Sequence, residues 1–135
     1  MHYFDIDVIV NAVVEQDPVK HLEAKGLILN AFNNNMFVIS TLVIQEVGYT
    51  LARLDVSSEE IEQNLAFFNS QNAYPVEYAT LKRGIELGAL IGFRHINDCV
   101  HTAIAEHLNC KTLYTYNKWD FKRIQKHTKL EISIL

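Results

Sequence analysis

Short apolar runs alternate along the chain with longer segments in which apolar residues recur at helical spacing. The apolar, β-branched runs predict strands at residues 3–10, 36–39, 73–76, 112–116 and 130–135, the first of them running into a helix or turn. The amphipathic segments predict helices at residues 17–34, 40–54, 57–69, 78–90, 97–108 and 119–127. Strands separated by helices favour an α/β fold with three αβα layers around a mainly parallel sheet of about five strands.

Residues with specific backbone preferences mark the ends of several elements. Asp17 followed by Pro18 predicts a helix start, with the aspartate as N-cap and the proline in the first turn. The run Ser-Ser-Glu-Glu at residues 57–60 predicts a capping box at the start of another helix. Pro75 cannot donate a backbone hydrogen bond, so the apolar run around it is expected at a sheet edge or a strand end.

Composition indicates one globular unit. The chain has 135 residues, 49% of them apolar, with two prolines and five glycines, so we expect a single domain over residues 1–135 without linkers. No apolar run approaches the roughly 18 residues that cross a bilayer, which predicts a soluble cytoplasmic protein that makes no membrane contact. Cys99 and Cys110 form no CxxC pair, so they are expected to be small buried hydrophobic residues.

Basic residues are concentrated in one segment. The net charge of −4 alone argues against a nucleic-acid partner, because phosphate binding uses Lys and Arg. Residues 111–129, however, contain six of the twelve basic residues and a single acid, Asp120. This segment is a candidate phosphate-binding surface. A solvated helix face would have the same composition, so charge alone leaves both interpretations open.

Two aspartates lie at the end of the first predicted strand, at the sheet edge where ligands of parallel α/β folds collect. Asp5 belongs to a buried apolar run, where a carboxylate is costly unless it is paired or bound to a metal. Asp7 points to the same side if the strand continues, and caps the next helix if it does not. We therefore take Asp5 as a candidate site residue and leave both roles open for Asp7.

Two further acids lie near predicted helix starts. Glu46 lies in the first two turns of the helix at 40–54, away from the buried stripe that Val43 and Val47 begin. Asp98 lies in the first turn of its helix, with His101 one turn further along the same face. Each acid has an ordinary alternative: Glu46 could be a solvent-facing glutamate, and Asp98 could only stabilise the helix dipole. For His101, a hydrogen bond to Asp98 is a simpler explanation than metal binding.

The segment at residues 113–121 supplies the last candidates. A strand ending in Thr is followed by Asn117 and then by Asp120, which opens a short helix. This order places one amide and one carboxylate at the same sheet edge as Asp5. Together, four carboxylates from four segments are predicted at one end of a parallel sheet, a donor set that suits Mg²⁺ or Mn²⁺: Asp5, Glu46, Asp98 and Asp120.

The same stretches resemble the motifs of the PIN-domain family, and of its VapC-type toxins in particular, over almost the whole chain. Residues 3–10 resemble the opening acidic motif, 40–47 the helix that carries the family's glutamate, 96–105 the motif with the third acid, and 115–121 the closing Thr-x-(Asp/Asn)-x-x-(Asp/Glu)-Phe signature. The chain departs from the family pattern at Ile6 and Asp7, where Thr and Asn are frequent. It also departs at Asn117, where members frequently have Asp.

The resemblance implies a PIN-like domain with metal-dependent endoribonuclease activity on single-stranded RNA, acting as the toxin of a toxin-antitoxin pair. Its implied partners are a protein antitoxin and a second copy of the chain in a homodimer. Asp5 and Asp98 are then expected to bind Mg²⁺, or Mn²⁺, directly. Glu46 and Asp120 are expected to bind it through water or to orient the attacking water, with Asn117 as a neutral helper. The carboxylates alone fit DNA equally well.

Two other functions fit part of the pattern. A receiver-like signalling domain also gathers acids and magnesium at the end of a parallel sheet, but it needs a phosphoacceptor aspartate after the third strand. Here only Glu77 follows that strand, and two consecutive helices precede it. A non-catalytic PIN-fold adaptor is the second alternative, because Asn117 replaces an acid. Metal-dependent cleavage of single-stranded RNA would discriminate all three.

Overall fold

Four parallel strands form the central sheet of the computed structural model, which describes all of residues 1–135. The strands are β1 (His2–Phe4), β2 (Phe37–Val38), β3 (Thr112–Thr115) and β4 (Glu131–Ile134), and their order in the sheet is β2-β1-β3-β4. Every pair of neighbouring strands is parallel. The predicted α/β fold with a mainly parallel sheet is therefore confirmed, with four strands in place of about five.

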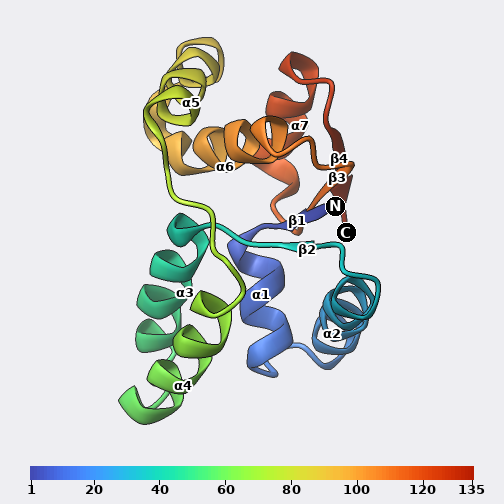
Figure 1. The fold of residues 1–135 in the computed structure, drawn as a ribbon, viewed down its shortest axis with the longest axis vertical. Coiled ribbons are helices and arrows are strands. Elements are labelled where there is room, and N and C mark those ends of the chain that lie inside the picture. Colours follow the sequence, from blue (N-terminus) through green and yellow to red (C-terminus); the bar gives the residue numbers. More distant parts are fainter.

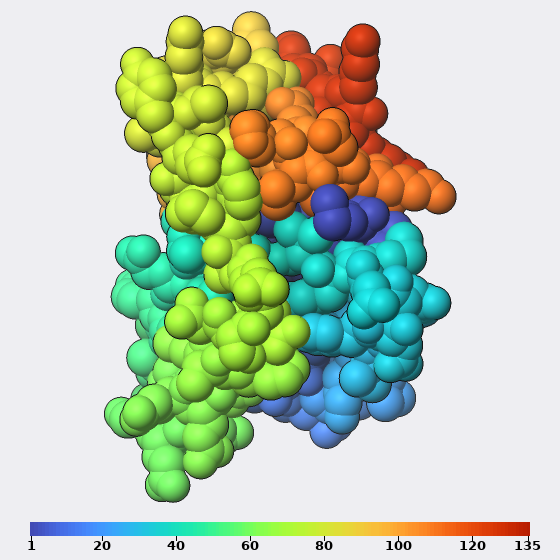
Figure 2. Space-filling model, viewed as in Figure 1, coloured from blue at the N-terminus to red at the C-terminus, as the bar shows by residue number.

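Seven α-helices cover the sheet. They are α1 (Ile6–Val13), α2 (Pro18–Asn33), α3 (Thr41–Arg53), α4 (Ser58–Asn69), α5 (Tyr78–Ile91), α6 (Ile96–His107) and α7 (Lys118–Ile124), with short 3₁₀ turns at Phe93–His95 and Gln125–His127. In Figure 1 the sheet lies between α1 to α4 on one side and α5 to α7 on the other, which is the predicted three-layer arrangement. Residues 70–77 run over the surface from one helical layer to the other (Figure 2). No helix has the length and apolar character needed to span a membrane.

Two of the predicted strands differ in the structure. The run at residues 3–10 is a strand only to Phe4, because Asp5 accepts a hydrogen bond from the N–H of Ile6 and begins α1. A short apolar run cannot be assigned to strand or helix from periodicity alone. The run at 73–76 forms no strand; Tyr74 makes a single bridge to Ser40, and the neighbouring Pro75 has no N–H with which to extend it.

The predicted helix starts are largely confirmed. Asp17 Oδ1 accepts hydrogen bonds from the N–H groups of Val19 and Lys20, directly before Pro18 opens α2. Ser57 Oγ accepts the N–H of Glu60 at the start of α4, which is the serine half of the predicted capping box. The helix predicted to begin at Asn97 begins at Ile96 instead, because the 3₁₀ turn after Gly92 leads straight into Ile96 and places Asn97 inside α6.

The core is built on both faces of the two central strands. Tyr3 and Phe4 of β1 and Leu113 of β3 are fully buried, and the free cysteines Cys99 and Cys110 are buried as predicted. In the layer formed by α5 to α7, the helices α5 and α6 approach closely at Gly84, where an added Cβ would lie 2.7 Å from Val100 Cγ2. Real Cβ atoms do not approach so closely, so this contact needs glycine and fixes α6 relative to α5.

Candidate metal centre

Asp5 lies at the carboxyl end of β1 and is held there by the neighbouring strand. Its backbone N–H donates to the carbonyl oxygen of Tyr114 in β3 at 2.9 Å. Its side chain is buried: Oδ2 accepts the hydroxyl of Thr115 at 2.8 Å, and Oδ1 accepts the N–H of Ile6 at 2.8 Å. Burial raises the pKa of Asp5, although His101 and the hydrogen bond from Thr115 act in the opposite direction. The predicted position of this acid at the sheet edge is thus found in the structure.

Asp7 joins the first turn of α1 to the chain that leaves β3. Its two carboxylate oxygens accept the N–H of Tyr116 at 3.2 and 3.1 Å. Burial, together with repulsion from Asp5, raises the pKa of Asp7 to about 7. Asp5, and not Asp7, is the N-cap of α1. Asp7 therefore connects α1 to the end of β3 through the N–H of Tyr116. Neither of the two roles considered from the sequence predicted this contact.

Asn117 holds the two remaining aspartates together. Its Nδ2 donates to Asp98 Oδ2 at 3.2 Å and to Asp120 Oδ2 at 2.8 Å, while its Oδ1 accepts the N–H of Asp120 at 3.3 Å. The amide adds no charge, so it bridges two acids without further repulsion. Burial raises the pKa of Asp98 to about 8, with further contributions from the nearby Asp5 and Asp120. Asp98 and Asp120 share the amide of Asn117, and Asp5 at the carboxyl end of β1 contributes to the raised pKa of Asp98; we call these three aspartates the acidic centre.

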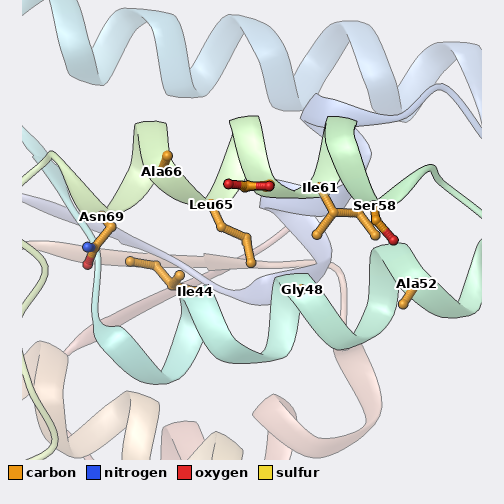
Figure 3. A pocket seen from close by; sticks show the side chains of 9 residues that line it. Ile44, Gly48, Ala52, Ser58, Ile61, Leu65, Ala66 and Asn69 are labelled. Carbon is orange, nitrogen blue, oxygen red and sulfur yellow. The ribbon is translucent and has the colours of Figure 1, made fainter.

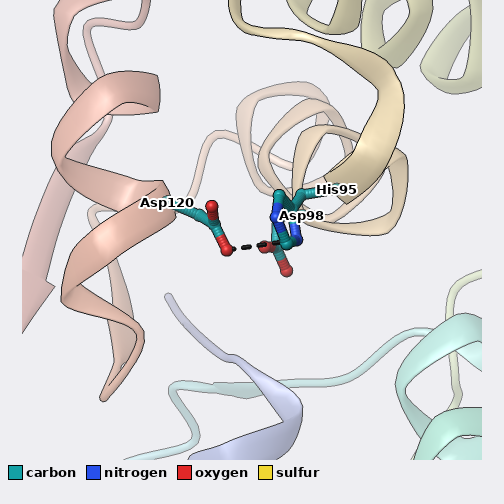
Figure 4. A group of neighbouring side chains, drawn as sticks. All are labelled: His95, Asp98 and Asp120. Carbon is teal, nitrogen blue, oxygen red and sulfur yellow. Dashed lines mark ion pairs between the residues drawn. The ribbon is translucent and has the colours of Figure 1, made fainter.

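His95 completes this group on the side of α6, although it was not among the residues predicted for the site. Its Nδ1 lies 3.2 Å from Asp120 Oδ2, and one ligand atom each of His95, Asp98 and Asp120 lie within 4.8 Å of one another (Figure 4). His95 precedes Asp98 by three residues, the spacing that brings side chains to one helix face. The sequence contains this spacing, but the predicted helix began at Asn97, so His95 was assigned to the turn before it.

Glu46 is held by α6 rather than exposed to solvent. Its Oε2 lies 2.7 Å from His101 Nε2, and its Oε1 accepts the side-chain amide of Asn97. Burial alone would lower the pKa of His101, but the hydrogen bond to Glu46 and the nearby acids raise it above its usual value. His101 is thus bound to Glu46, and the expected hydrogen bond to Asp98 is not formed.

A buried polar chain continues behind His101. His101 is completely buried, and its Nδ1 lies 2.8 Å from the hydroxyl of Tyr3, which in turn lies 2.6 Å from Ser40 Oγ. Ser40 also caps α3 by accepting the N–H of Val43. The position of Glu46 is therefore fixed by contacts that extend through the core to β1 and to the start of its own helix.

The donor set of the acidic centre fits a divalent cation. Asp120 Oδ1 is buried without a hydrogen-bond partner, and its nearest cation is Arg123, whose Nη2 lies 3.6 Å away. A buried carboxylate oxygen without a partner costs free energy, and a cation would satisfy it. Carboxylate oxygens suit Mg²⁺ and Mn²⁺, and the imidazole of His95 is a further possible donor for Mn²⁺.

Comparison with known proteins shows the family to which this fold belongs. The family model for the PIN domain matches residues 3–127. The chain belongs to the PIN-domain family. Among solved PIN-like structures, the crystal structure of VapBC2 from Rickettsia felis bound to a DNA fragment from their promoter has a similar chain, with a TM-score of 0.69 and 22% identity over 100% of this chain and 99% of that chain. No curated protein matches the sequence.

A hollow on the surface of this PIN domain lies apart from the acidic centre. It has a volume of about 620 Å³ between α3 and α4, and Figure 3 shows Ile44, Ile61 and Leu65 pointing into it across Gly48. An added Cβ on Gly48 would lie 2.9 Å from Leu65 Cδ1, a contact that a rotation of the leucine side chain would relieve. The lining contains one ionisable residue, Glu62, and therefore offers no acid-base pair for catalysis.

Proposed function

We propose that this PIN-domain protein is a metal-dependent endoribonuclease that cleaves single-stranded RNA, and that it is the toxin of a toxin-antitoxin pair. The observation that carries the proposal is the acidic centre of Asp5, Asp98 and Asp120 at the carboxyl edge of the sheet, with one buried carboxylate oxygen left without a partner. An acidic centre of this kind is unfavourable unless a cation neutralises it.

In this proposal the side chains have different tasks. Asp5 and Asp98 hold Mg²⁺ or Mn²⁺ directly, Asp120 binds the ion through its buried oxygen without a hydrogen-bond partner or through water, and Glu46 orients water beside it. Asn117 keeps Asp98 and Asp120 in place. When bound, the ion lowers the pKa of water and stabilises charge on the phosphate oxygens. His101 restricts Glu46 to one orientation through its 2.7 Å contact.

Neither Cys99 nor Ser40 is activated as a nucleophile, which supports water as the attacking group. Burial raises the pKa of the Cys99 thiol to about 11, so this cysteine is protonated at neutral pH. The hydroxyl of Ser40 contacts the hydroxyl of Tyr3 and caps α3, and it has no histidine beside it to remove its proton. A covalent mechanism would need one of these groups to be deprotonated.

The similar VapBC2 structure supports a protein antitoxin as partner, because its name describes a complex bound to promoter DNA. The acidic centre favours catalysis over a non-catalytic adaptor, since an adaptor has no need for acids whose repulsion destabilises the fold. The PIN-domain match over residues 3–127 removes the receiver-like alternative.

The test of the proposal is a cleavage assay with purified protein. Single-stranded RNA is expected to be cut in the presence of Mg²⁺ or Mn²⁺ and to remain intact in excess chelator, while a fully paired RNA of the same sequence is cut more slowly. Expression of the wild-type chain in bacteria without an antitoxin is expected to arrest growth. Cleavage that continues in chelator would show that the acidic centre is not the catalytic site.

A further prediction concerns the neutral bridge between the acids. Asn117→Ala is expected to weaken Mn²⁺ binding by about 10- to 100-fold, the usual loss when a residue that orients metal ligands is removed. Titration of the purified variant with Mn²⁺, followed by calorimetry, measures this change. Asn34→Ala is the matched control, because Asn34 is exposed and its side chain binds only Asn30. Equal affinity of Asn117→Ala and wild type would assign Asn117 to helix capping alone.

A further inference from the structure

Trp119 is the only tryptophan of the chain, and the residue is 80% exposed. It lies in the first turn of α7, directly before Asp120 of the acidic centre. Burying an indole would stabilise the fold considerably, so a tryptophan left in water indicates a surface used for binding. Folding alone gives no reason for this residue at this position.

Three cations surround the exposed indole. Lys118, Lys122 and Arg123 line, together with Trp119, a hollow of about 450 Å³. This volume lies within the range of about 300 to 1,000 Å³ typical of small-ligand sites. Neither Lys118 nor Lys122 takes part in any of the five ion pairs of the protein, so their charges are available to an anion. The hollow therefore combines a flat aromatic face with uncompensated positive charge.

The helix connects this hollow to the acidic centre. Trp119, Lys122 and Arg123 are three and four residues apart and share one face of α7, whereas Asp120 points inward and is buried. Arg123 also lies 3.6 Å from Asp120 Oδ1, so it belongs to both surfaces. The backbone of Trp119 directly precedes that of Asp120, with consecutive Cα atoms about 3.8 Å apart, so the hollow borders the acidic centre. A chain bound in the hollow would thus continue into the site.

We propose that Trp119 stacks on an unpaired base of the nucleic-acid substrate, while Lys118, Lys122 and Arg123 bind the phosphates on either side. The inference rests on the proposed function and specifies how that site selects single strands. Base faces are free to stack on an aromatic side chain only where the strand is unpaired. Trp119 is then a positioning residue, since it holds the strand without contacting the reacting phosphate.

The same surface is less suited to an acidic peptide. A peptide of this kind would satisfy the three cations, but Asp and Glu side chains carry no flat ring for the exposed indole. A nucleotide supplies both the negative charge and the aromatic face. The composition of the hollow therefore favours single-stranded nucleic acid, and an acidic peptide is the contrasting ligand in the experiment.

Because Trp119 is the only tryptophan, its fluorescence reports on this position alone. We expect a single-stranded RNA octamer, added to the full-length protein in chelator so that it is not cut, to quench this emission in a saturable manner. An octamer of abasic nucleotides, which keeps the phosphates but lacks the bases, should quench far less. A poly-glutamate peptide of equal charge should produce no saturable quenching.

Variants are then compared by the anisotropy of a labelled octamer. Trp119→Ala is expected to weaken binding by about tenfold or more, in keeping with the usual contribution of one stacked base, and Trp119→Phe should restore much of the loss. Lys122→Gln should reduce the slope of log affinity against log salt by about 0.7, the value for one contact with a single strand. In cleavage assays Trp119→Ala should raise KM and leave kcat close to wild type.

Tyr78→Ala is the matched control. Tyr78 is as exposed as Trp119 and also lies in the first turn of a helix, α5, in the same layer of the fold. It does not line the hollow. This variant should bind the octamer with wild-type affinity.

RNA cleavage by wild type combined with unchanged binding by Trp119→Ala would overturn the stacking role and leave the proposed nuclease intact. Equal quenching by the abasic octamer, or saturable quenching by the peptide alone, would also overturn it. Base-dependent quenching without metal-dependent cleavage would support the stacking role and refute the proposed nuclease.

Discussion

Asp98→Asn is expected to reduce cleavage of single-stranded RNA by more than about a hundredfold. Removing a residue that only orients metal ligands costs up to about a hundredfold, and the loss of a ligand itself should be larger. Asparagine keeps the shape of the side chain, so the loss reports the missing negative charge. Asp98 shares the amide of Asn117 with Asp120 and lies within Coulomb range of Asp5. Asp5→Asn should have an effect of similar size. Initial rates of cleavage at saturating Mg²⁺ measure both.

Asp55→Asn is the control for this loss. Asp55 is exposed in the turn between α3 and α4, as the sequence predicted, and its φ of 59° is a conformation that asparagine also adopts readily. This variant should cleave at the wild-type rate. Glu46→Gln should have a smaller effect than Asp98→Asn, since glutamine can still bind Asn97. Wild-type activity in Asp98→Asn would remove Asp98 from the catalytic set and leave it as a helix-terminal acid.

Metal-free protein is expected to become less stable as pH rises from about 4 to about 8. Asp98 and Asp7 have ordinary pKa values of 3.8, and in the folded protein burial and neighbouring acids raise them to about 8 and about 7. Between these limits the folded state binds more protons than the unfolded state, so the free energy of unfolding falls with increasing pH. Thermal unfolding in chelator at pH 5, 6.5 and 8 measures this trend.

Mg²⁺ should reverse the trend, because the ion binds the ionised carboxylates of the folded state. Stabilisation of about 2.7 kcal/mol is expected at a hundredfold excess of metal over its dissociation constant, and the rise in Tm should be larger at pH 8 than at pH 5. Asp98→Asn should raise the Tm of metal-free protein at pH 8 and shrink the increment from Mg²⁺, whereas Asp55→Asn should do neither. A lower metal-free Tm in Asp98→Asn with a full Mg²⁺ increment would contradict the repulsive acidic centre.

The fold class and the position of the acidic edge could be predicted because they depend on local rules. Strands separated by helices require parallel pairing, and parallel strands bring their carboxyl ends to one edge. This places Asp5 and the segment after Thr115 together without knowledge of any tertiary contact. The run at 73–76 could not be assigned in this way, since whether a short apolar segment pairs with a sheet depends on neighbours distant in the sequence.

The details of the site depend on contacts that sequence patterns do not contain. Glu46 had the spacing of a solvent-facing residue, and only the approach of α6 places His101 and Asn97 against its carboxylate. His95 was missed because the 3₁₀ turn at Phe93–His95 carries no capping signal, although it directs the imidazole toward Asp120. In both cases the packing of α6 on its neighbours determines what the side chain contacts.

The order of strands in the sheet also determines when the acidic centre can form during synthesis. β1 pairs with β3, and Asp5 receives its hydrogen bond from Thr115, 110 residues later in the chain. Folds with such distant contacts fold slowly, because a long loop must close before the contacts form. A nascent chain that ends before β3 holds Asp5 without Thr115, and it contains neither Asn117 nor Asp120. The ribosome must therefore complete β3 and the first turn of α7 before the protein can assemble its cation-binding edge.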